Sequence, residues 1–183
     1  SVATTIATQP QNENLTSLTW LLAHQKWSVA SEVTWQILAP AAPDHTLQTE
    51  HCNLILEIDR LWTHYSGGRY GFEAQERVWD SLASGQSATQ PTTQPATRNR
   101  SIGDRIQQFR QRVGWTANRA SATATPKPIG AFPAEAPWPT DPHQPLLCGD
   151  RACTPSPTAI AAAYPSLGII QMFDRCLEQS PQF

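Results

Sequence analysis

The stretch IDRLWTHYSGGRYGFEAQERVW, residues 58–79, contains two helical patterns joined by a glycine-rich turn. The first pattern is a periodic apolar face, which predicts an amphipathic helix. This face consists of Leu54, Ile58, Leu61, Trp62 and Tyr65. Ser66-Gly67-Gly68 should end the helix, because glycine adopts the left-handed conformation that closes helices. The stretch therefore predicts a helix, a tight turn and a second helix.

Two shorter helices are predicted before this stretch. Thr16 or Ser17 can cap the first helix, and Ser28 can cap the second, which must end before Pro40. Their apolar stripes are Leu18, Leu21 and Leu22 in the first helix, and Val29, Val33 and Ile37 in the second. Together they predict a helical hairpin.

Three more helices are predicted after the turn, each with an apolar face. The first ends at Gly85 and carries Phe72, Gln75, Val78, Trp79 and Leu82. The second is capped by Ser101, ends at Gly114 and carries Ile102, Ile106, Phe109 and Val113. The last begins near Pro157, can break at Pro165 and carries Ile169, Met172, Phe173 and Cys176. No strand pattern competes, so the predicted fold is all-α, a compact helical bundle.

The length of 183 residues favours one domain with tails. We expect a helical domain over residues 15–178, preceded by a disordered polar tail at 1–14 and followed by a short tail at 179–183. Within the domain, residues 86–100 have almost nothing to bury and predict a disordered insertion. Residues 116–157 are rich in proline but contain apolar side chains, which predicts an ordered irregular loop across the helices.

The composition excludes several functions. Lys+Arg 13 nearly balances Asp+Glu 15, so the chain lacks the basic surplus that binds nucleic acids. The sequence has no run of about 18 consecutive apolar residues, so no membrane span is predicted. Ser1 is followed by no signal-peptide pattern, and processing or trimming could have produced this start. The four cysteines are too few and too scattered for a fold built on disulfides, so the compartment stays open.

Neither a catalytic site nor a metal site is predicted. The five histidines lie in different segments, and no serine or cysteine has the setting of a nucleophile. Glu57 and Asp59 lie on different faces of a helix, which favours solvent and cap contacts over a carboxylate pair. His143, Cys148 and Cys153 have an unusual spacing for zinc, so two free thiols or a loop disulfide remain the alternatives. We expect no enzyme and no resident cofactor or metal.

The aromatic residues fall into two groups. Trp35, Trp62 and Trp79 lie on helical stripes and predict core packing. Trp115, Phe132 and Trp138 lie instead just past a helix or in the proline-rich loop, where aromatic rings over a helical base can form a site for a flat apolar ligand. Basic residues that could bind acidic substituents of such a ligand are Arg69, Arg112, Arg119 and Lys127. Alternatively, the loop only caps the core.

The central stretch also resembles a known family. Ile58-Asp59-Arg60-Leu61-Trp62, then 65–72 with Gln75, and then Arg112-Val113-Gly114-Trp115 are similar in order and spacing to the Genomes-uncoupled-four domain. The opening hairpin, the run Ile129-Gly130-Ala131-Phe132-Pro133 and the last helix also look like this family, so the resemblance extends over residues 15–177.

The resemblance implies a fold shaped like a cupped hand and a ligand, protoporphyrin or its magnesium form, in the hydrophobic concave face. It implies a non-catalytic regulator that stimulates magnesium chelatase through its large subunit in chlorophyll synthesis. The chain would come from an oxygenic phototroph such as a cyanobacterium, cytoplasmic or peripheral to the thylakoid membrane. Carried onto this chain, the implied site has Arg69 near its entrance, a floor of Tyr70, Phe72 and Val78, and walls and lid of Phe109, Val113, Trp115, Phe132 and Trp138, with Arg112 nearby.

A second function remains open. Where the family has further aromatic positions after Trp115, this chain reads Asn118-Arg119-Ala120-Ser121, and the usual Gly-His-Leu-Pro reads Gly130-Ala131-Phe132-Pro133. This altered lid, with the proline-rich segments, is compatible with a ligand-free or bilin-binding subunit of a photosynthetic assembly.

Overall fold

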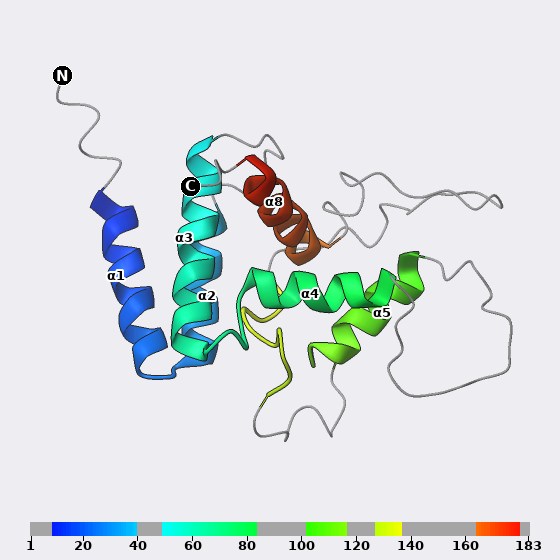
Figure 1. Cartoon of the computed structure of the whole chain (residues 1–183). Coiled ribbons are helices and arrows are strands. Elements are labelled where there is room, and N and C mark those ends of the chain that lie inside the picture. The colour runs from blue at the N-terminus through cyan, green and yellow to red at the C-terminus, as the bar shows by residue number, and fades with distance from the viewer. Residues whose placement is uncertain (1–8, 40–48, 84–101, 117–126, 137–163, 180–183) are drawn as a thin grey trace, which may run out of the picture.

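Six helices make up most of the part of the chain that the computed structural model describes (Figure 1). The described residues are 9–39, 49–83, 102–116, 127–136 and 164–179. These ranges contain no strand, so the predicted all-α class is confirmed. Predictions for 1–8, the 86–100 insertion and most of the 116–157 loop lie outside the described residues.

Helix α1, Gln9–Ala23, begins earlier than the sequence analysis predicts. A start at Thr16 or Ser17 is wrong, and so is the assignment of residues 9–14 to a tail. These polar residues include glutamine and glutamate, which have good helix propensity, so a helix can extend beyond its buried part. Leu18 and Leu22, both fully buried, anchor α1 to the core.

Helix α2, Trp27–Leu38, buries only part of the predicted face: Ile37 is buried and Val33 is half-buried. Ala30, Thr34 and Leu38 are fully buried, whereas Val29 is 48% exposed. The reason is that the Thr34 hydroxyl is satisfied inside the core, where it donates to the Ala30 carbonyl at 2.9 Å. The predicted Ser28 cap is also wrong, because the helix begins at Trp27 and the preceding residue makes no side-chain cap hydrogen bond.

The central helix–turn–helix prediction is confirmed. Helix α3, Thr49–Ser66, is followed by Gly67 and Gly68 with φ values of 63° and 77°, and α4, Phe72–Ala83, follows the turn. The N–H of Gly68 donates to the Thr63 carbonyl at 2.8 Å, which closes the end of α3. In Figure 1, α1, α2 and α3 run side by side, while α4 runs away from α3 at a steep angle with α5 beside it.

The last two helices agree with the predicted apolar faces. Helix α5, Ile102–Arg112, buries Ile106 and Phe109, and α8, Pro165–Gln179, buries Phe173 and Cys176. Pro165 is the first residue of α8, so it starts the helix instead of breaking it. Proline is favoured at this position, because the first N–H groups of a helix have no intrahelical partner. The predicted start near Pro157 lies outside the described residues.

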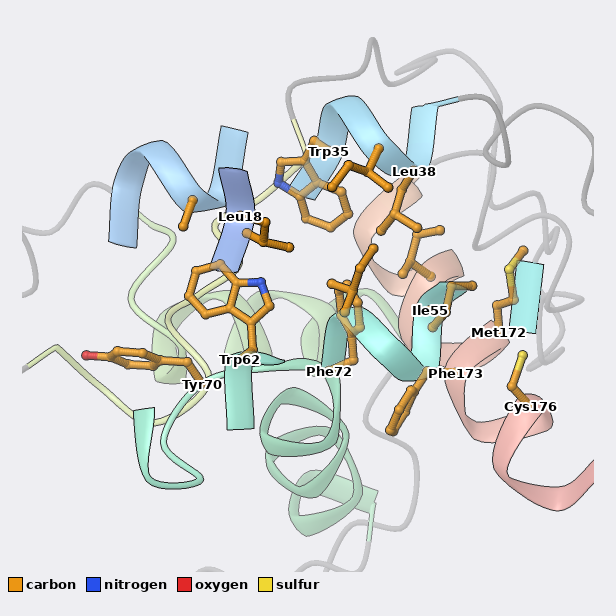
Figure 2. Packing of buried hydrophobic residues seen from close by; sticks show 14 of the residues in the cluster. Leu18, Trp35, Leu38, Ile55, Trp62, Tyr70, Phe72, Met172, Phe173 and Cys176 are labelled. Atoms are coloured by element: carbon orange, nitrogen blue, oxygen red, sulfur yellow. The ribbon is translucent and has the colours of Figure 1, made fainter. Parts of the chain in front are cut away.

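Two apolar clusters form the core. The larger one joins α1, α2, α3, α4 and α8, and Figure 2 shows Trp62, Phe72 and Phe173 within it. The smaller one joins α4, α5 and α8; its buried members are Ile106, Phe109, Val113, Leu167 and Ile170. Trp35 and Trp62 are buried as predicted, whereas Trp79 is half-buried.

A disulfide joins α3 to α8, the last of the described helices. Cys52, in the first turn of α3, is bonded to Cys176 in α8, 124 residues later, with a Cα–Cα distance of 5.2 Å. Both cysteines are buried in the larger cluster. The sequence does not predict this pair, because connectivity across such a distance cannot be read from cysteine spacing. Cys148 and Cys153 lie outside the described residues.

Candidate functional site

Residues 127–136 form an irregular segment that lies across α2, α4, α5 and α8; we call it the crossing segment. Side chains of α2 hold its C-terminal half. The Trp35 indole N–H donates to the Ala134 carbonyl at 2.9 Å, and the Ala134 N–H donates to the Ser31 hydroxyl at 2.8 Å. Side chains of α2 therefore bind both the backbone carbonyl and the backbone N–H of Ala134.

Helices α5 and α8 bind the next residues of the crossing segment. The Ala136 N–H donates to the Ser166 hydroxyl at 2.7 Å. Arg110 forms an ion pair with Glu135, with 2.8 Å between Nη2 and Oε2. Within residues 127–136, the structure agrees with an ordered irregular loop laid across the helices.

The turn between α3 and α4 holds the first half of the crossing segment. The Gly130 N–H donates to the Arg69 carbonyl at 2.8 Å, and the Gly71 N–H donates to the Phe132 carbonyl at 2.9 Å. The Arg69 guanidinium also donates to the Lys127 carbonyl at 2.8 Å. The glycine-rich turn and the crossing segment are thus one hydrogen-bonded unit, although they lie far apart in the sequence.

Four aromatic rings meet where this unit contacts the larger core cluster. Phe132 is stacked on Trp62, with 6.2 Å between ring centroids and 8° between planes. Tyr70 meets Phe132 edge-on at 5.2 Å, and Trp27 at the start of α2 meets Tyr70 at 5.3 Å. Trp62 and Tyr70 are buried, while Trp27 and Phe132 are half-buried. We call Trp27, Trp62, Tyr70 and Phe132 the four-ring cluster.

A second group of predicted site residues lies around α5. Trp115 meets Phe109 edge-on at 5.4 Å, and its indole N–H donates to the Ala131 carbonyl at 3.1 Å. Val113 is fully buried and Val78 is half-buried in the same cluster. Trp115 therefore links this cluster to the crossing segment.

Seven of the ten predicted site residues lie in two neighbouring groups. Arg69, Tyr70 and Phe132 are brought together at the turn, and Val78, Phe109, Val113 and Trp115 are brought together beside α5. Arg112 is exposed on α5, with Nη1 3.3 Å from the Ser81 hydroxyl. Trp138 lies outside the described residues.

Three of these residues are fully buried. Phe72, Phe109 and Val113 have 0% exposure. Phe72 lies between Trp35 and Phe173, each 6.2 Å away between ring centroids. These three side chains therefore belong to the core, whereas Phe132 and Trp115 are half-buried and keep part of their rings exposed.

Two residues at the site were not predicted as part of it. Trp27 is the first residue of α2, and nothing in its spacing signals contact with Tyr70. Gln75 was noted on the apolar face of its helix, and its polarity at a buried position was the available signal. Its amide donates to the carbonyls of Gly130 and Pro133, at 3.0 and 2.7 Å.

Two carboxyl groups near α4 have raised pKa values. Asp59 is buried, and burial is the main cause that raises its pKa to about 6, although N–H donation from Phe72 and Glu73 opposes the shift. Burial, followed by a hydrogen bond and repulsion with Asp174 of α8, raises the pKa of Glu76 to about 7. Neither group contacts the four-ring cluster through a described hydrogen bond.

Metal ligation and membrane insertion find no support in the described ranges. No group of three or more His, Cys, Asp or Glu residues is placed there to hold a metal ion. No described helix combines the length and the apolar character needed to cross a bilayer. His143 of the weak zinc pattern lies outside the described residues.

The helical domain with its bound crossing segment can be compared with known proteins. A family model described as GUN4-like matches residues 8–154, which is most of the chain. The chain therefore belongs to the GUN4-like family, the Genomes-uncoupled-four family that its central stretch resembles. A search of curated proteins and a search of solved structures each gave no match.

Proposed function

We propose that this protein is a non-catalytic tetrapyrrole-binding regulator. It binds protoporphyrin or magnesium protoporphyrin and stimulates magnesium chelatase, through the large subunit of that enzyme, in chlorophyll synthesis. The observation that carries the proposal is membership of the GUN4-like family, with a match that contains both the central turn and the crossing segment. A cyanobacterial origin and a cytoplasmic or thylakoid-peripheral location belong to the same proposal.

The chemistry of the turn region supports this function. A tetrapyrrole offers a flat apolar ring and carboxylate substituents, so it needs aromatic surface beside cationic donors. Phe132 and Trp27 are half-buried rings that both contact Tyr70, the residue after Arg69, and Trp115 is a third half-buried ring, bound to the crossing segment through the Ala131 carbonyl. Arg69 uses one guanidinium N–H for the Lys127 carbonyl, which leaves further donors of its five for a carboxylate.

The residues of this chain would bind, orient and shield the ligand. Apolar burial against Phe132 and Trp115 would supply most of the affinity, and charge-assisted hydrogen bonds from Arg69 would fix the orientation. The fully buried Phe72, Phe109 and Val113 would keep the supporting surface rigid. Chelation chemistry would belong to the partner enzyme.

Titration with protoporphyrin tests the proposal. Binding near Trp27 and Trp115 should quench tryptophan fluorescence and shift the Soret band of the porphyrin. Phe132→Ala should weaken binding about tenfold or more, because it removes ring surface. The matched control is Ile129→Ala, on the same segment but 53% exposed, which should bind as the wild type does. Unchanged emission and an unshifted Soret band at micromolar porphyrin would rule the function out.

Stimulation of the enzyme needs its own assay. Adding the protein to magnesium chelatase should raise the rate of magnesium insertion, and Phe132→Ala should raise it less at the same concentration. Porphyrin binding without stimulation would leave a pigment-binding protein that acts on a different partner.

A second candidate is a ligand-free or bilin-binding subunit of a photosynthetic assembly. The observation that favours it is that aromatic groups at the crossing segment already have partners within the protein. Phe132 stacks on Trp62, and the Trp115 indole N–H donates to the Ala131 carbonyl. Native isolation separates the candidates. A stoichiometric, colourless component of a large complex supports the subunit, whereas a free porphyrin-binding monomer excludes it.

A further inference from the structure

Gln75 is a fully buried polar residue in the first turn of α4. One terminal atom of its side chain lies 3.0 Å from the Gly130 carbonyl oxygen and 2.7 Å from the Pro133 carbonyl oxygen. Two acceptors at hydrogen-bonding distance identify this atom as the amide nitrogen, because an oxygen there would face two oxygens. The orientation of the amide is therefore fixed by its partners.

The two carbonyls lie on either side of Phe132. Gly130 is two residues before this phenylalanine, and Pro133 directly follows it, so Gln75 binds the backbone on both sides of the ring-bearing residue. The Phe132 carbonyl in turn accepts the N–H of Gly71, just before α4. The position of the Phe132 ring over Trp62 is thus determined from the start of α4.

A primary amide is well suited to this task. The position is fully buried, so lysine or arginine would bring a charge into the core at high cost. Serine or threonine would supply a single O–H donor, whereas the glutamine amide supplies two N–H donors and no charge. The fit is tight, because a Cβ added at Gly130 would lie 3.2 Å from Val113 Cγ1 and 3.4 Å from Gln75 Cα.

We propose that Gln75 is a positioning residue for the tetrapyrrole site. By binding the Gly130 and Pro133 carbonyls, Gln75 holds Phe132 in the ligand-binding geometry. We call the two hydrogen bonds from Gln75 to the Gly130 and Pro133 carbonyls the latch between α4 and the crossing segment. The effect of the latch on ligand binding rests on the proposed function, whereas the latch itself does not depend on that function. Gln75 itself does not contact the ligand; it acts through the backbone of the crossing segment.

The wild-type protein provides the first test. Both N–H protons of Gln75 are hydrogen-bonded in the core, so NMR should show one glutamine side-chain NH2 pair that exchanges slowly with solvent. Phe132 ring protons should be shifted by the stacked Trp62 ring. If all glutamine side-chain NH2 signals exchange at the rate of exposed amides, the latch does not exist.

The second test uses Gln75→Met, which keeps the length and removes both donors. We expect the amide protons of Gly71 and Gly130 to exchange about tenfold faster while α3 amides keep their protection. The Phe132 ring shifts should decrease, and porphyrin affinity should fall about tenfold at unchanged absorption of the bound state. The control is Gln107→Met, the same substitution at an exposed position of α5, which should leave all of these unchanged.

Each outcome decides between the claims. If amide exchange at Gly71 and Gly130 and the Phe132 ring shifts are unchanged in Gln75→Met, the latch is overturned. If exchange is faster but porphyrin affinity equals that of the wild type, the positioning role is overturned. If the wild type binds no porphyrin, the proposed function and the positioning role fail together, while exchange still decides the latch. If Gln75→Met does not fold, Gln75→Asn, with a shorter arm that retains the donors, should show intermediate exchange and affinity.

Discussion

Asp59 of α3 caps the first turn of α4, because its Oδ1 accepts the backbone N–H of Phe72 at 2.6 Å and that of Glu73 at 3.1 Å. The carboxyl group is buried, with 5% of the residue exposed. A side chain thirteen residues earlier thus satisfies two N–H groups that a helix start leaves without partners. It also sets the geometry of the turn that binds the crossing segment.

Removal of this cap should destabilise the protein. Asp59→Ala leaves two buried N–H groups unsatisfied, so we expect the free energy of unfolding to fall by about 1–2 kcal/mol. Asp59→Asn retains an acceptor oxygen and should cost less. Urea unfolding measures both, with Glu57→Ala, at an exposed position of the same helix, as the control. Equal losses in the alanine and asparagine variants would contradict capping.

Gly71 is required by space as well as by backbone conformation. Its φ is +115°, and an added Cβ would lie 2.6 Å from Asp59 Oδ1 and 3.3 Å from Trp62 Cβ. Gly67 also has a positive φ, +63°, but a Cβ there would meet nothing within 4 Å. Gly67→Ala should therefore cost only the backbone strain of about 1–2 kcal/mol.

We expect Gly71→Ala to cost clearly more, since the cap or the Trp62 packing must also move. Thermal and urea unfolding of the two variants provide the comparison. Equal losses would show that the close approach of Gly71 to Asp59 has no energetic consequence, and that only the left-handed conformation matters at the turn.

Stability should depend on pH through Asp59 and Glu76. Their folded-state pKa values are raised, from 3.8 to about 6 and from 4.5 to about 7, so the folded state binds protons that the unfolded state has already released. The stabilisation that comes from binding these protons is therefore fully present below about pH 4. It is lost as pH rises through the folded-state pKa values of about 6 and about 7.

Neutral variants separate this contribution from other titrating groups. Glu76→Gln should gain stability relative to the wild type between pH 5 and pH 8, because it avoids both the burial of a charge and the repulsion from Asp174 at high pH. The stability of Asp59→Asn relative to the wild type should also rise with pH, about one pH unit lower, because the folded-state pKa of Asp59 is about 6 and that of Glu76 is about 7. Urea unfolding at several pH values measures the difference between variant and wild type, and a difference that stays constant from pH 5 to 8 would contradict the raised pKa of Glu76.

The sequence predicts much of the fold because several helices have strong periodic faces and clear stops. The turn after Ser66 and the helix from Phe72 follow from the positions of glycine and of apolar residues. The buried face of α2 could be predicted only in part, because Thr34 is made acceptable in the core by donating to the Ala30 carbonyl and accepting from the Trp62 indole N–H. Apolar periodicity does not register a polar residue that is satisfied by a distant partner.

The candidate site was predictable only in its composition. Loop aromatics pointed to Trp115 and Phe132, the family resemblance added Tyr70, and the structure holds all three near the crossing segment. The hydrogen bond from Trp35 to the Ala134 carbonyl joins residues 99 apart and has no local signature. Such contacts decide which rings are reachable and which are core, so burial could not be assigned from the sequence.

Reduction of the Cys52–Cys176 disulfide should lower stability. The bond closes 124 residues and ties α3 to α8, so its loss should increase the entropy of the unfolded chain and cost about 2–4 kcal/mol. Urea unfolding with and without a dithiol reductant measures this cost. A variant with both Cys52→Ala and Cys176→Ala is the control, because its midpoint should not respond to the reductant. If the variant responds as strongly as the wild type does, the stabilising bond lies elsewhere in the chain, and α3 and α8 are held together by apolar packing alone.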